Sequence, residues 1–299
     1  MSKDAVAIIL LNWNSYRDTY DCLKSLEDLD HKNIHVFLAD NKSKDDSFNT
    51  LKKDFRNGVF NLDITFIQTG ANLGFAGGNN VAIKEAYKLG YYYFWLLNND
   101  TVVNSNALSE LLSTLKSDTS VGIVGSKIYY FGTNSIWFAG GTVNTWTGRT
   151  SHIGQREVDS GQFDQMKEIG YITGCSLCFP RPLLEEIGYM KEEYFLYYEE
   201  TDWNLRARNK GWKIVYNPKS IVYHKVSMST GGEKNPSPIV AFYDLRNAYW
   251  MIKNTQPRKK HIVALCFKYL KAIKKLGRVV KQNNKLTRIK YIGKALISK

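Results

Sequence analysis

The sequence contains little cysteine and no long apolar run, and both absences narrow the classes of protein that it can encode. Four cysteines occur in 299 residues, and Cys175 and Cys178 form one C-x-x-C motif. No second cysteine or histidine pair stands at zinc-binding spacing, which disfavours a metal or redox role and indicates the reduced thiols of a cytosolic protein. No window reaches the roughly 18 uninterrupted apolar residues of a membrane-spanning helix. The first residues, MSKDAVAIILLNWN, lack the features of a secretory signal, so we expect no leader.

Acidic residues are absent after Asp244. The remaining 55 residues contain 16 of the 41 Lys and Arg side chains and no Asp or Glu. The chain up to Asp244 therefore carries 25 basic and 28 acidic side chains, and the net charge of +13 belongs to the C-terminal segment. A slightly acidic body is not a nucleic-acid-binding domain by charge, and the basic segment needs its own explanation.

The glycine-rich motifs of dehydrogenases and ATPases are also missing. GFAGGNN (74–80) is neither G-x-G-x-x-G nor a Walker motif, which disfavours nicotinamide and ATP as ligands. Its glycines predict either a flexible turn or a close approach of the backbone to a ligand. With 43% hydrophobic and 13% aromatic residues, the composition is typical of a folded chain of one large or two modest domains.

Apolar runs alternate with helical patterns through the first 117 residues. The runs predict strands over 5–11, 34–40, 64–68 and 91–97, and apolar spacing predicts helices over 16–26, 77–90 and 105–117. Unbroken apolar strands that alternate with helices indicate a mostly parallel, Rossmann-like sheet with helices on both faces. The sequence therefore predicts an α/β fold.

Polar residues follow each of these four strands. They are Asn12-Trp13-Asn14, Asp40-Asn41, Asn72-Leu73-Gly74 and Asn98-Asn99-Asp100. One such ending is an ordinary turn, but the carboxyl ends of parallel strands meet at the edge where ligands bind. Four polar endings on one edge predict a ligand site.

Asp100 and His224 are the candidate metal ligands. Asp100 either caps a turn or, with a neighbouring Asn and a diphosphate, holds Mg²⁺ or Mn²⁺. His224 ends the apolar run SIVYH and is either a structural histidine or the partner of Asp100 at one cation. The residues alone leave both alternatives open.

A second acidic cluster, Glu199, Glu200 and Asp202, follows the aromatic stretch FLYY. These carboxylates either stabilise the start of a helix through its dipole or include a general base whose pKa the aromatic wall raises. Upstream, between residues 121 and 170, short β-like pieces flank a polar loop over 147–165. Such a loop suits substrate recognition.

Seven stretches taken together resemble the family 2 glycosyltransferases, most closely their bacterial rhamnosyltransferase-like branch. They are ILLNWN, FLADNKSKDDS, NLGFAGGNN, FWLLNNDT, ITGCSLCFPR, FLYYEETDWNLRARNKGW and VYHKVSMSTG. The resemblance covers residues 4–250 in order and is far more specific than any single motif. It implies a GT-A domain over 1–250, with a nucleotide-binding half (1–103) and an acceptor and catalytic half (104–250). It also implies an inverting reaction with a nucleotide-diphosphate sugar donor and Mg²⁺ or Mn²⁺.

The resemblance implies a donor site at the strand ends. Asp40 matches the family residue that contacts the base or ribose, and His224 matches a histidine near the metal or diphosphate. Asn98 replaces the first carboxylate of the family's D-x-D motif, which leaves Asp100 as the metal ligand. The implied donor-nucleotide residues are Asn12, Asn14, Asp40, Asn72, Gly74, Asn98 and Asn99.

The resemblance also implies a catalytic base. The family base is the second acid of a pair, which corresponds to Glu200 and leaves Glu199 as the alternative. Asp202 and Trp203 match positions that bind the acceptor or anchor the helix. In the implied reaction, the base takes the proton of an acceptor hydroxyl as its oxygen attacks the anomeric carbon.

The basic segment over 251–299 has apolar residues near helical spacing among its lysines, namely Ile262, Leu265, Tyr269, Leu270 and Ile273. It is either a solvated helix packed on the body or a basic amphipathic helix on an anionic membrane. We favour the membrane, because it suits a lipid-linked acceptor, and we expect no nucleic-acid partner.

The expected function is transfer of rhamnose from dTDP-rhamnose to a growing, lipid-linked, cell-surface polysaccharide. The enzyme would work at the cytoplasmic, inner face of the cell membrane. A UDP-hexose donor is one alternative, and a catalytically silent glycan- or membrane-binding protein of the same fold is another. A nucleotidyltransferase would need a basic, glycine-rich loop after the first strand, which NWNSYRD does not provide.

Overall fold

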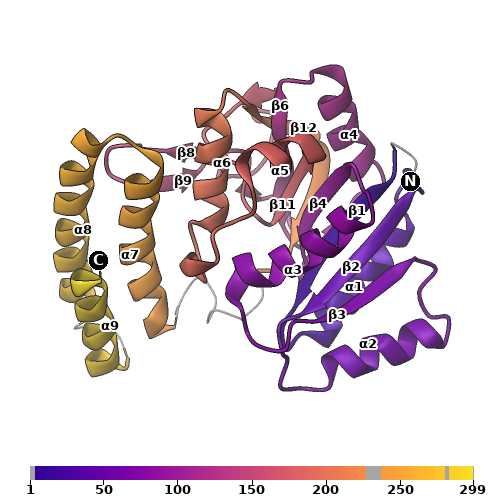
Figure 1. The fold of residues 1–299 in the computed structure, drawn as a ribbon, viewed down its shortest axis with the longest axis horizontal. Helices are drawn as coiled ribbons and strands as arrows, with labels where there is room; N and C mark the ends of the chain where they lie inside the picture. Colours follow the sequence, from indigo (N-terminus) through magenta and orange to yellow (C-terminus); the bar gives the residue numbers. More distant parts are fainter. Residues whose placement is uncertain (1–3, 227–236, 280–282, 299) are drawn as a thin grey trace.

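A computed structural model describes residues 4–226, 237–279 and 283–298 of the chain. Figure 1 shows a twisted central sheet with helices packed against it and, at the left, a layer of three helices. The segment SMSTGG after Val226, part of the family resemblance, lies outside the described residues.

The first four strands are parallel neighbours and confirm the predicted α/β fold. Their order in the sheet is β4-β1-β2-β3. Ile8, Ile9 and Leu10 are consecutive and all fully buried, so both faces of β1 are covered. The bounds are β1 (Val6–Asn12), β2 (Ile34–Asp40), β3 (Ile64–Gln68) and β4 (Tyr93–Asn98).

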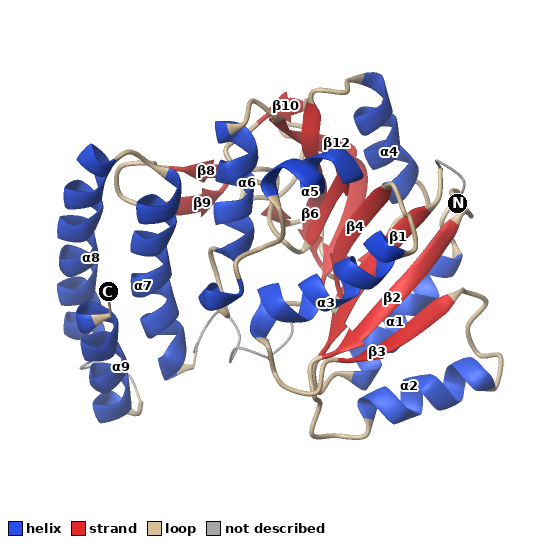
Figure 2. Cartoon of the chain, viewed as in Figure 1, coloured by secondary structure: helices blue, strands red, loops and turns tan. Residues whose placement is uncertain are grey.

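Helices cover the two faces of this sheet. In Figure 2, α3, α5 and α6 lie in front of the strands and α1 lies behind them. The sequence did not predict α2, a short helix beside β3. The bounds are α1 (Tyr16–Glu27), α2 (Ser47–Arg56), α3 (Gly74–Lys88), α4 (Ala107–Ser117), α5 (Arg181–Ile187) and α6 (Glu199–Asn209).

The other side of the sheet is mixed rather than parallel. β6 (Val121–Tyr130) and β12 (Lys213–His224) are parallel to each other, but β11 (Ser176–Pro180) lies between β4 and β6 and is antiparallel to both. The short β5 (Thr101–Val103) pairs antiparallel with the end of β12. Strands from both sides of residue 103 therefore form one continuous sheet.

The registers bring the predicted strand ends together. Asn12 lies opposite Asp40, and Asp40 lies opposite Gln68, in the β1–β2 and β2–β3 pairs. In the β1–β4 pair, Leu11 lies opposite Asn98. The polar endings therefore stand side by side at one edge, as the sequence predicts.

The segment between β6 and β11 contains the short strands predicted for it. Within it, Lys127 of β6 is buried and binds Asp159 at 2.7 Å, and it also contacts Asp164. Two side chains of the polar 147–165 segment are thus attached to the sheet. The strands are β7 (Ile136–Phe138), β8 (Gly141–Val143), β9 (Thr150–His152) and β10 (Lys167–Glu168).

The C-terminal layer consists of α7 (Pro238–Thr255), α8 (Arg258–Val279) and α9 (Lys285–Ile297). The three helices pack on one another, and α7 also packs on α6. The predicted domain boundary at residue 250 falls inside α7, so the helical layer begins at Pro238. Among the described residues, no helix has the length and apolar character needed to cross a membrane.

Candidate functional site

Asp40 is held rigidly at the centre of the strand-end edge. Its Oδ1 accepts hydrogen bonds from Asn12 Nδ2 at 2.8 Å and Ser43 Oγ at 2.5 Å, and its Oδ2 accepts from Gln68 Nε2 at 2.9 Å. Asn12 is fully buried, and its Oδ1 accepts a hydrogen bond from Thr19. Asn12 can therefore act on a ligand only by orienting Asp40.

Asn14 and Asn72 lie in the loops of the same edge. The exposed Asn14 has a left-handed backbone (φ 52°), and its Oδ1 accepts the backbone N–H of Lys44 at 2.6 Å. Asn72, also exposed, accepts the backbone N–H of Gly74 at 3.0 Å. Both side chains therefore stabilise loops at the strand-end edge.

Gly74 permits a close approach of two backbone segments. It has φ +71°, and a Cβ at this position would stand 2.2 Å from the carbonyl oxygen of Phe195. The next residue, Phe75, donates its backbone N–H to the same oxygen at 2.8 Å. The sequence predicted a flexible turn or a close approach to a ligand at these glycines, whereas the close approach at Gly74 is made to the aromatic stretch before α6.

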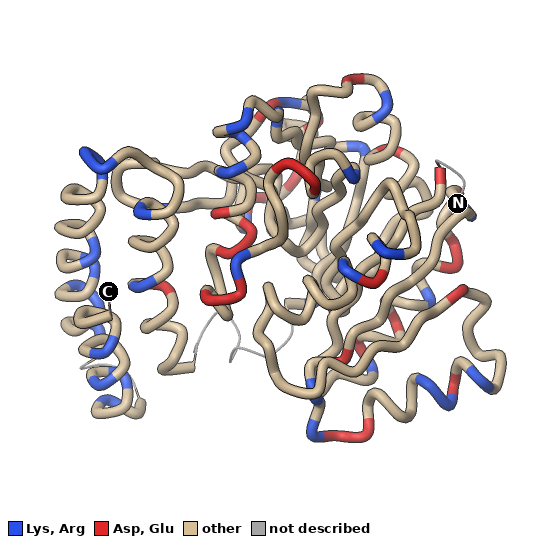
Figure 3. The backbone as a smooth tube through the Cα atoms, in the orientation of Figure 1, with Lys and Arg blue, Asp and Glu red and all other residues tan. Residues whose placement is uncertain are grey.

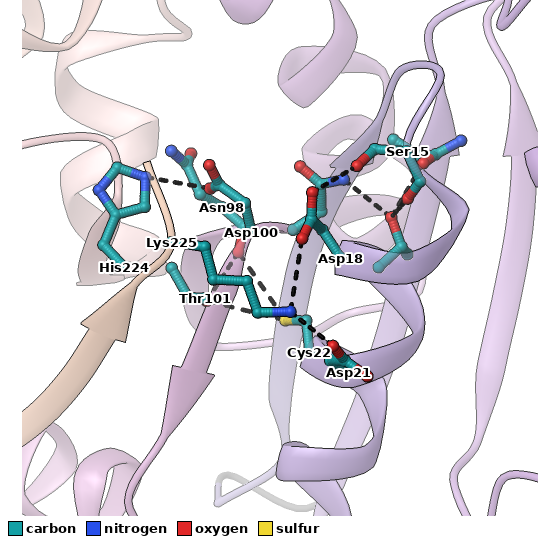
Figure 4. Close-up of polar contacts among 12 residues, drawn as sticks. Ser15, Asp18, Asp21, Cys22, Asn98, Asp100, Thr101, His224 and Lys225 are labelled. Atoms are coloured by element: carbon teal, nitrogen blue, oxygen red, sulfur yellow. Dashed lines mark hydrogen bonds and ion pairs between the residues drawn. The ribbon is translucent and has the colours of Figure 1, made fainter. Parts of the chain in front are cut away.

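Asp100 and His224 meet at the end of the sheet. The two side chains are buried, and His224 Nε2 lies 3.1 Å from Asp100 Oδ1 (Figure 4). The antiparallel pairing of β5 with β12, which sets His224 opposite Thr101, brings them together. The next residue, Lys225, turns toward α1 and binds Asp21 at 2.5 Å. Two strands and a helix therefore fix this pair.

The pair fits a divalent cation that also binds a diphosphate. Two ligand atoms about 2.1 Å from an octahedral cation, at right angles to each other, lie about 3 Å apart. His224 Nε2 and Asp100 Oδ1 are separated by 3.1 Å, which is close to this value. Among the described residues no group of three His, Cys, Asp or Glu side chains could hold a metal, so further ligands would come from phosphate oxygens and water. Burial disfavours charged His224, but Cys175 and the Asp100 carboxylate raise its pKa well above the usual value. A cation would displace this proton.

Asn98 and Asn99 differ in position. The side chain of Asn98 lies beside Asp100 (Figure 4), whereas Asn99 Nδ2 donates to Thr19 Oγ1 at 2.8 Å. Thr19 in turn donates to Asn12. Asn99 therefore belongs to the network that supports the edge, and Asn98 is the amide nearer to the candidate metal pair.

Glu199 and Glu200 begin α6, and only Glu200 reaches the surface of a cleft. This cleft has a volume of about 280 Å³. Burial raises the pKa of Glu200, and burial followed by the charge of Glu200 raises the pKa of Glu199 well above its usual range. Glu199 is buried, and among the described residues its Oε2 has no hydrogen-bond partner. Because burial and the charge of Glu200 both raise the pKa of Glu199, its carboxyl favours the neutral form more strongly than that of Glu200.

The cleft combines segments that the sequence indicated with others that it did not. β9 lies in the polar 147–165 loop predicted for substrate recognition, and Tyr197 and Tyr198 belong to the aromatic stretch before Glu199. Tyr171, before β11, and the residues of α7 were not selected from the sequence. Aromatic side chains and one further carboxylate thus surround Glu200. The lining residues are Thr150, His152, Tyr171, Tyr197, Tyr198, Glu200, Thr201, Val240 and Asp244.

Trp137 of β7 connects the cleft with the metal pair. Its ring makes edge contacts with His224, at a centroid distance of 4.4 Å, and with His152, at 4.7 Å. His152 lines the cleft together with Glu200. One indole therefore lies between the candidate cation ligands and His152 in the wall of the cleft.

The aromatic stretch before α6 has a strained backbone that α7 supports. Phe195, Tyr197 and Tyr198 have φ between 63° and 72°, in the left-handed region that costs a non-glycine residue about 1–2 kcal/mol. The fully buried Asn247 donates its side-chain amide to the carbonyls of Tyr194, Leu196 and Tyr197 at 2.8–3.0 Å. These bonds hold the turn that aims Glu199 and Glu200.

Asp202 and Trp203 face away from the cleft. Asp202 is fully buried, with Arg206 Nε at 2.9 Å and the Tyr194 hydroxyl at 3.1 Å. Trp203 is also fully buried and donates its indole N–H to the carbonyl of Gly188 at 2.7 Å. Both residues anchor α6 to its surroundings, and neither lines the cleft of Glu200.

Known proteins are similar in sequence to this chain over most of its length. A low-salt glycan biosynthesis hexosyltransferase of Haloferax volcanii is 26% identical over 215 residues, which cover 71% of this chain and 64% of the relative. An N-acetylglucosaminyl-diphospho-decaprenol L-rhamnosyltransferase of Mycobacterium tuberculosis is 22% identical over 76% of this chain and 78% of its own length. The chain thus spans just under two thirds of the archaeal relative.

Solved structures share the GT-A fold. S. aureus TarS (residues 1–349) in complex with UDP-GlcNAc aligns with a TM-score of 0.63 at 16% identity, over 97% of this chain and 80% of that one. The mannosyltransferase PcManGT from Pyrobaculum calidifontis in complex with GDP-Man and Mn²⁺ aligns with a TM-score of 0.59 at 12% identity, over 97% and 73%. The profile described as "Glycosyl transferase family 2" matches residues 7–188. The chain therefore belongs to glycosyl transferase family 2.

Proposed function

We propose that this chain is an inverting, metal-dependent glycosyltransferase that moves a sugar from a nucleotide-diphosphate donor to a hydroxyl of a glycan acceptor. The observation that carries the proposal is the pairing of two features. Glu200, a carboxyl whose pKa burial raises, opens into a cleft, and Trp137 links that cleft to the Asp100–His224 pair.

The residues divide the reaction between them. Glu200 takes the proton of the acceptor hydroxyl, and its raised pKa makes it a stronger base than an exposed glutamate. Asp100 and His224 would hold Mg²⁺ or Mn²⁺, which would supply positive charge at the departing diphosphate. Because the hydroxyl attacks from the face opposite the leaving group, one displacement inverts the anomeric centre.

The donor that we propose first is dTDP-rhamnose. The mycobacterial relative is named as an L-rhamnosyltransferase, and its alignment covers most of both chains. A UDP- or GDP-linked hexose is the second candidate, because TarS holds UDP-GlcNAc and PcManGT holds GDP-Man. These neighbours show the fold alone, so nucleotide preference needs a direct measurement.

The acceptor that we propose is a lipid-linked glycan, and the enzyme would act at the inner face of the cell membrane in cell-surface polysaccharide synthesis. The name of the mycobacterial relative, an N-acetylglucosaminyl-diphospho-decaprenol transferase, describes an acceptor of this kind. The cleft at Glu200 is partly walled by α7, the first helix of the basic C-terminal layer.

A thermal-shift panel tests the donor site. dTDP, UDP and GDP are added with and without Mn²⁺ to the wild-type chain, to Asp100→Ala and to a matched surface control, Asp28→Ala. A ligand present at 100 times its Kd raises the stability of the folded state by about 2.7 kcal/mol. We expect a metal-dependent shift in wild type and control that is lost in Asp100→Ala. No shift with any nucleotide would refute the proposal in favour of a catalytically silent protein of this fold.

A further inference from the structure

α8 presents apolar side chains outward and basic side chains inward. Ile262, Leu270 and Ile273 are 71%, 64% and 66% exposed, and their spacing places them on one side of the helix. On the opposite side, Ala264 and Lys268 are buried against the rest of the helical layer. A solvated surface helix has the reverse pattern, so the outward side of α8 requires a partner.

α9 continues this surface. Leu286 and Ile297 are 84% and 82% exposed, and Ile289 lies between them at 47%. Ile292 and Ala295 on the other side of the helix are buried in the cluster shared with α7 and α8. We call the exposed apolar residues of both helices (Ile262, Tyr269, Leu270, Ile273, Leu286, Ile289 and Ile297) the α8–α9 face.

Basic side chains border the α8–α9 face without any acidic residue. From residue 245 to the end of the chain there is no Asp or Glu, and Figure 3 shows α8 and α9 carrying Lys and Arg alone. Exposed examples are Lys259, Lys274, Arg278, Lys290 and Lys294. An apolar stripe with a uniformly basic border is complementary to a surface that is negatively charged outside and apolar beneath.

We infer that the α8–α9 face docks on the surface of an anionic lipid bilayer. The apolar side chains enter the headgroup boundary, and the bordering Lys and Arg bind lipid phosphates. A second copy of this chain fits less well, because two uniformly basic borders would repel each other. A nucleic acid offers no apolar layer for these side chains.

The docking surface is joined to the cleft through Asp244. Its carboxylate lies 2.7 Å from Lys271 and 2.9 Å from Lys275, both on the inward side of α8. It also accepts the Tyr198 hydroxyl at 3.3 Å and lines the cleft of Glu200. A bilayer bound to the outward side of α8 would therefore be separated from the cleft by this helix, about 10 Å across. This part of the inference rests on the proposed function, since it assumes a lipid-linked acceptor.

Vesicle co-sedimentation of the full chain tests the inference. The probes are vesicles of phosphatidylcholine alone and of phosphatidylcholine mixed with phosphatidylglycerol, at low and high salt. We expect binding to the anionic vesicles only, weakened by salt. Leu270→Ser with Ile273→Ser should weaken binding by about tenfold or more, whereas Leu89→Ser, an exposed apolar residue on the body, should not.

Charge reversal separates the electrostatic contribution to vesicle binding from the contribution of the apolar side chains. Lys274→Glu with Lys290→Glu should abolish selectivity for anionic vesicles, and Lys53→Glu on α2 should leave it unchanged. All substituted side chains are exposed, so the melting temperature should stay at the wild-type value and confirm folding. Unchanged binding in the serine variant, or equal binding to both vesicles, would overturn the inference.

Sedimentation velocity without lipid tests the alternative that a second copy of this chain binds the α8–α9 face. A monomer is expected, and a dimer that the serine variant dissociates would overturn the inference in favour of self-association. The nucleotide thermal shift is measured on the same variants and should be unchanged. If the wild-type chain shows the nucleotide shift but binds no vesicles, only the docking surface is refuted. Vesicle binding by the wild-type chain without any nucleotide shift would refute only the proposed transferase.

Discussion

Replacing each of the two adjacent glutamates by glutamine distinguishes the catalytic base from its neighbour. Glu200→Gln keeps the shape of the side chain but removes the group that accepts the proton from the acceptor. Loss of a general base costs about 10²–10⁴ in rate, which corresponds to roughly 3–5 kcal/mol of transition-state stabilisation. We expect kcat to fall by this factor while the thermal shift with the donor nucleotide is retained.

Glu199→Gln is the matched control, and the structure predicts a different outcome. Burial and the charge of Glu200 raise the pKa of Glu199, so its carboxyl is neutral when Glu200 is ionised. A neutral carboxyl and an amide have nearly the same shape and charge. We therefore expect a change in kcat of less than about tenfold, since no proton-accepting group is lost.

The pH profile gives the assay a second readout. Glu200 must be deprotonated to act, and burial raises its pKa, so kcat should fall as the pH is lowered through a value above the ordinary glutamate pKa of 4.5. The apparent pKa belongs to the Glu199–Glu200 pair. Transfer is followed by release of the nucleoside diphosphate, and the anomeric configuration of the product by NMR. A silent Glu199→Gln enzyme beside an active Glu200→Gln enzyme would refute the assignment.

Four further substitutions, one of them a control, test the site and its supports. Asn247→Ala removes the amide that binds three carbonyls of the turn before α6, and we expect a loss of about 1–3 kcal/mol in urea unfolding together with reduced kcat. Gly74→Ala would place a Cβ 2.2 Å from the Phe195 oxygen at φ +71° and should cost about 3 kcal/mol or more. Gly90→Ala, with φ +86° and open space around it, should cost only about 1–2 kcal/mol, and equal melting temperatures for the two glycine variants would contradict this. Asp100→Asn should retain nucleotide binding without metal and lose the additional stabilisation by Mn²⁺ in a calorimetric titration.

The strand-end edge can be predicted from the sequence because residues that are close together in the chain determine it. Each parallel strand is an unbroken apolar run, and Asn12, Asp40 and Asn98 stand at the positions where these runs stop. Parallel pairing then brings the endings together, as the observed registers confirm. The polar residues that form this edge lie within a few positions of each strand end, so a single sequence is enough to identify them.

The cleft could not be predicted in the same way, because its residues meet only through tertiary packing. His152, Tyr171 and Asp244 are separated by tens of residues, and none stands in a motif. The antiparallel insertion of β11 between β4 and β6 is also invisible in its short apolar pattern, which suits either direction. The sequence around Asn247 is an ordinary helical pattern. Its role in holding the turn is visible only in the structure, where its side chain binds three backbone carbonyls.

The strained turn before α6 depends on the C-terminal layer, which links that layer to the orientation of the proposed base. Three non-glycine residues in the left-handed region together cost several kcal/mol, and a free loop would relax out of that conformation. Asn247 of α7 supplies the hydrogen bonds that oppose relaxation, and Phe195 packs against Gly74 on the other side. The family profile ends at residue 188, before Glu200. In the proposed reaction the sheet edge would position the donor and α7 would position the base. A helical layer that also binds a membrane would hold base, acceptor and bilayer in one rigid arrangement.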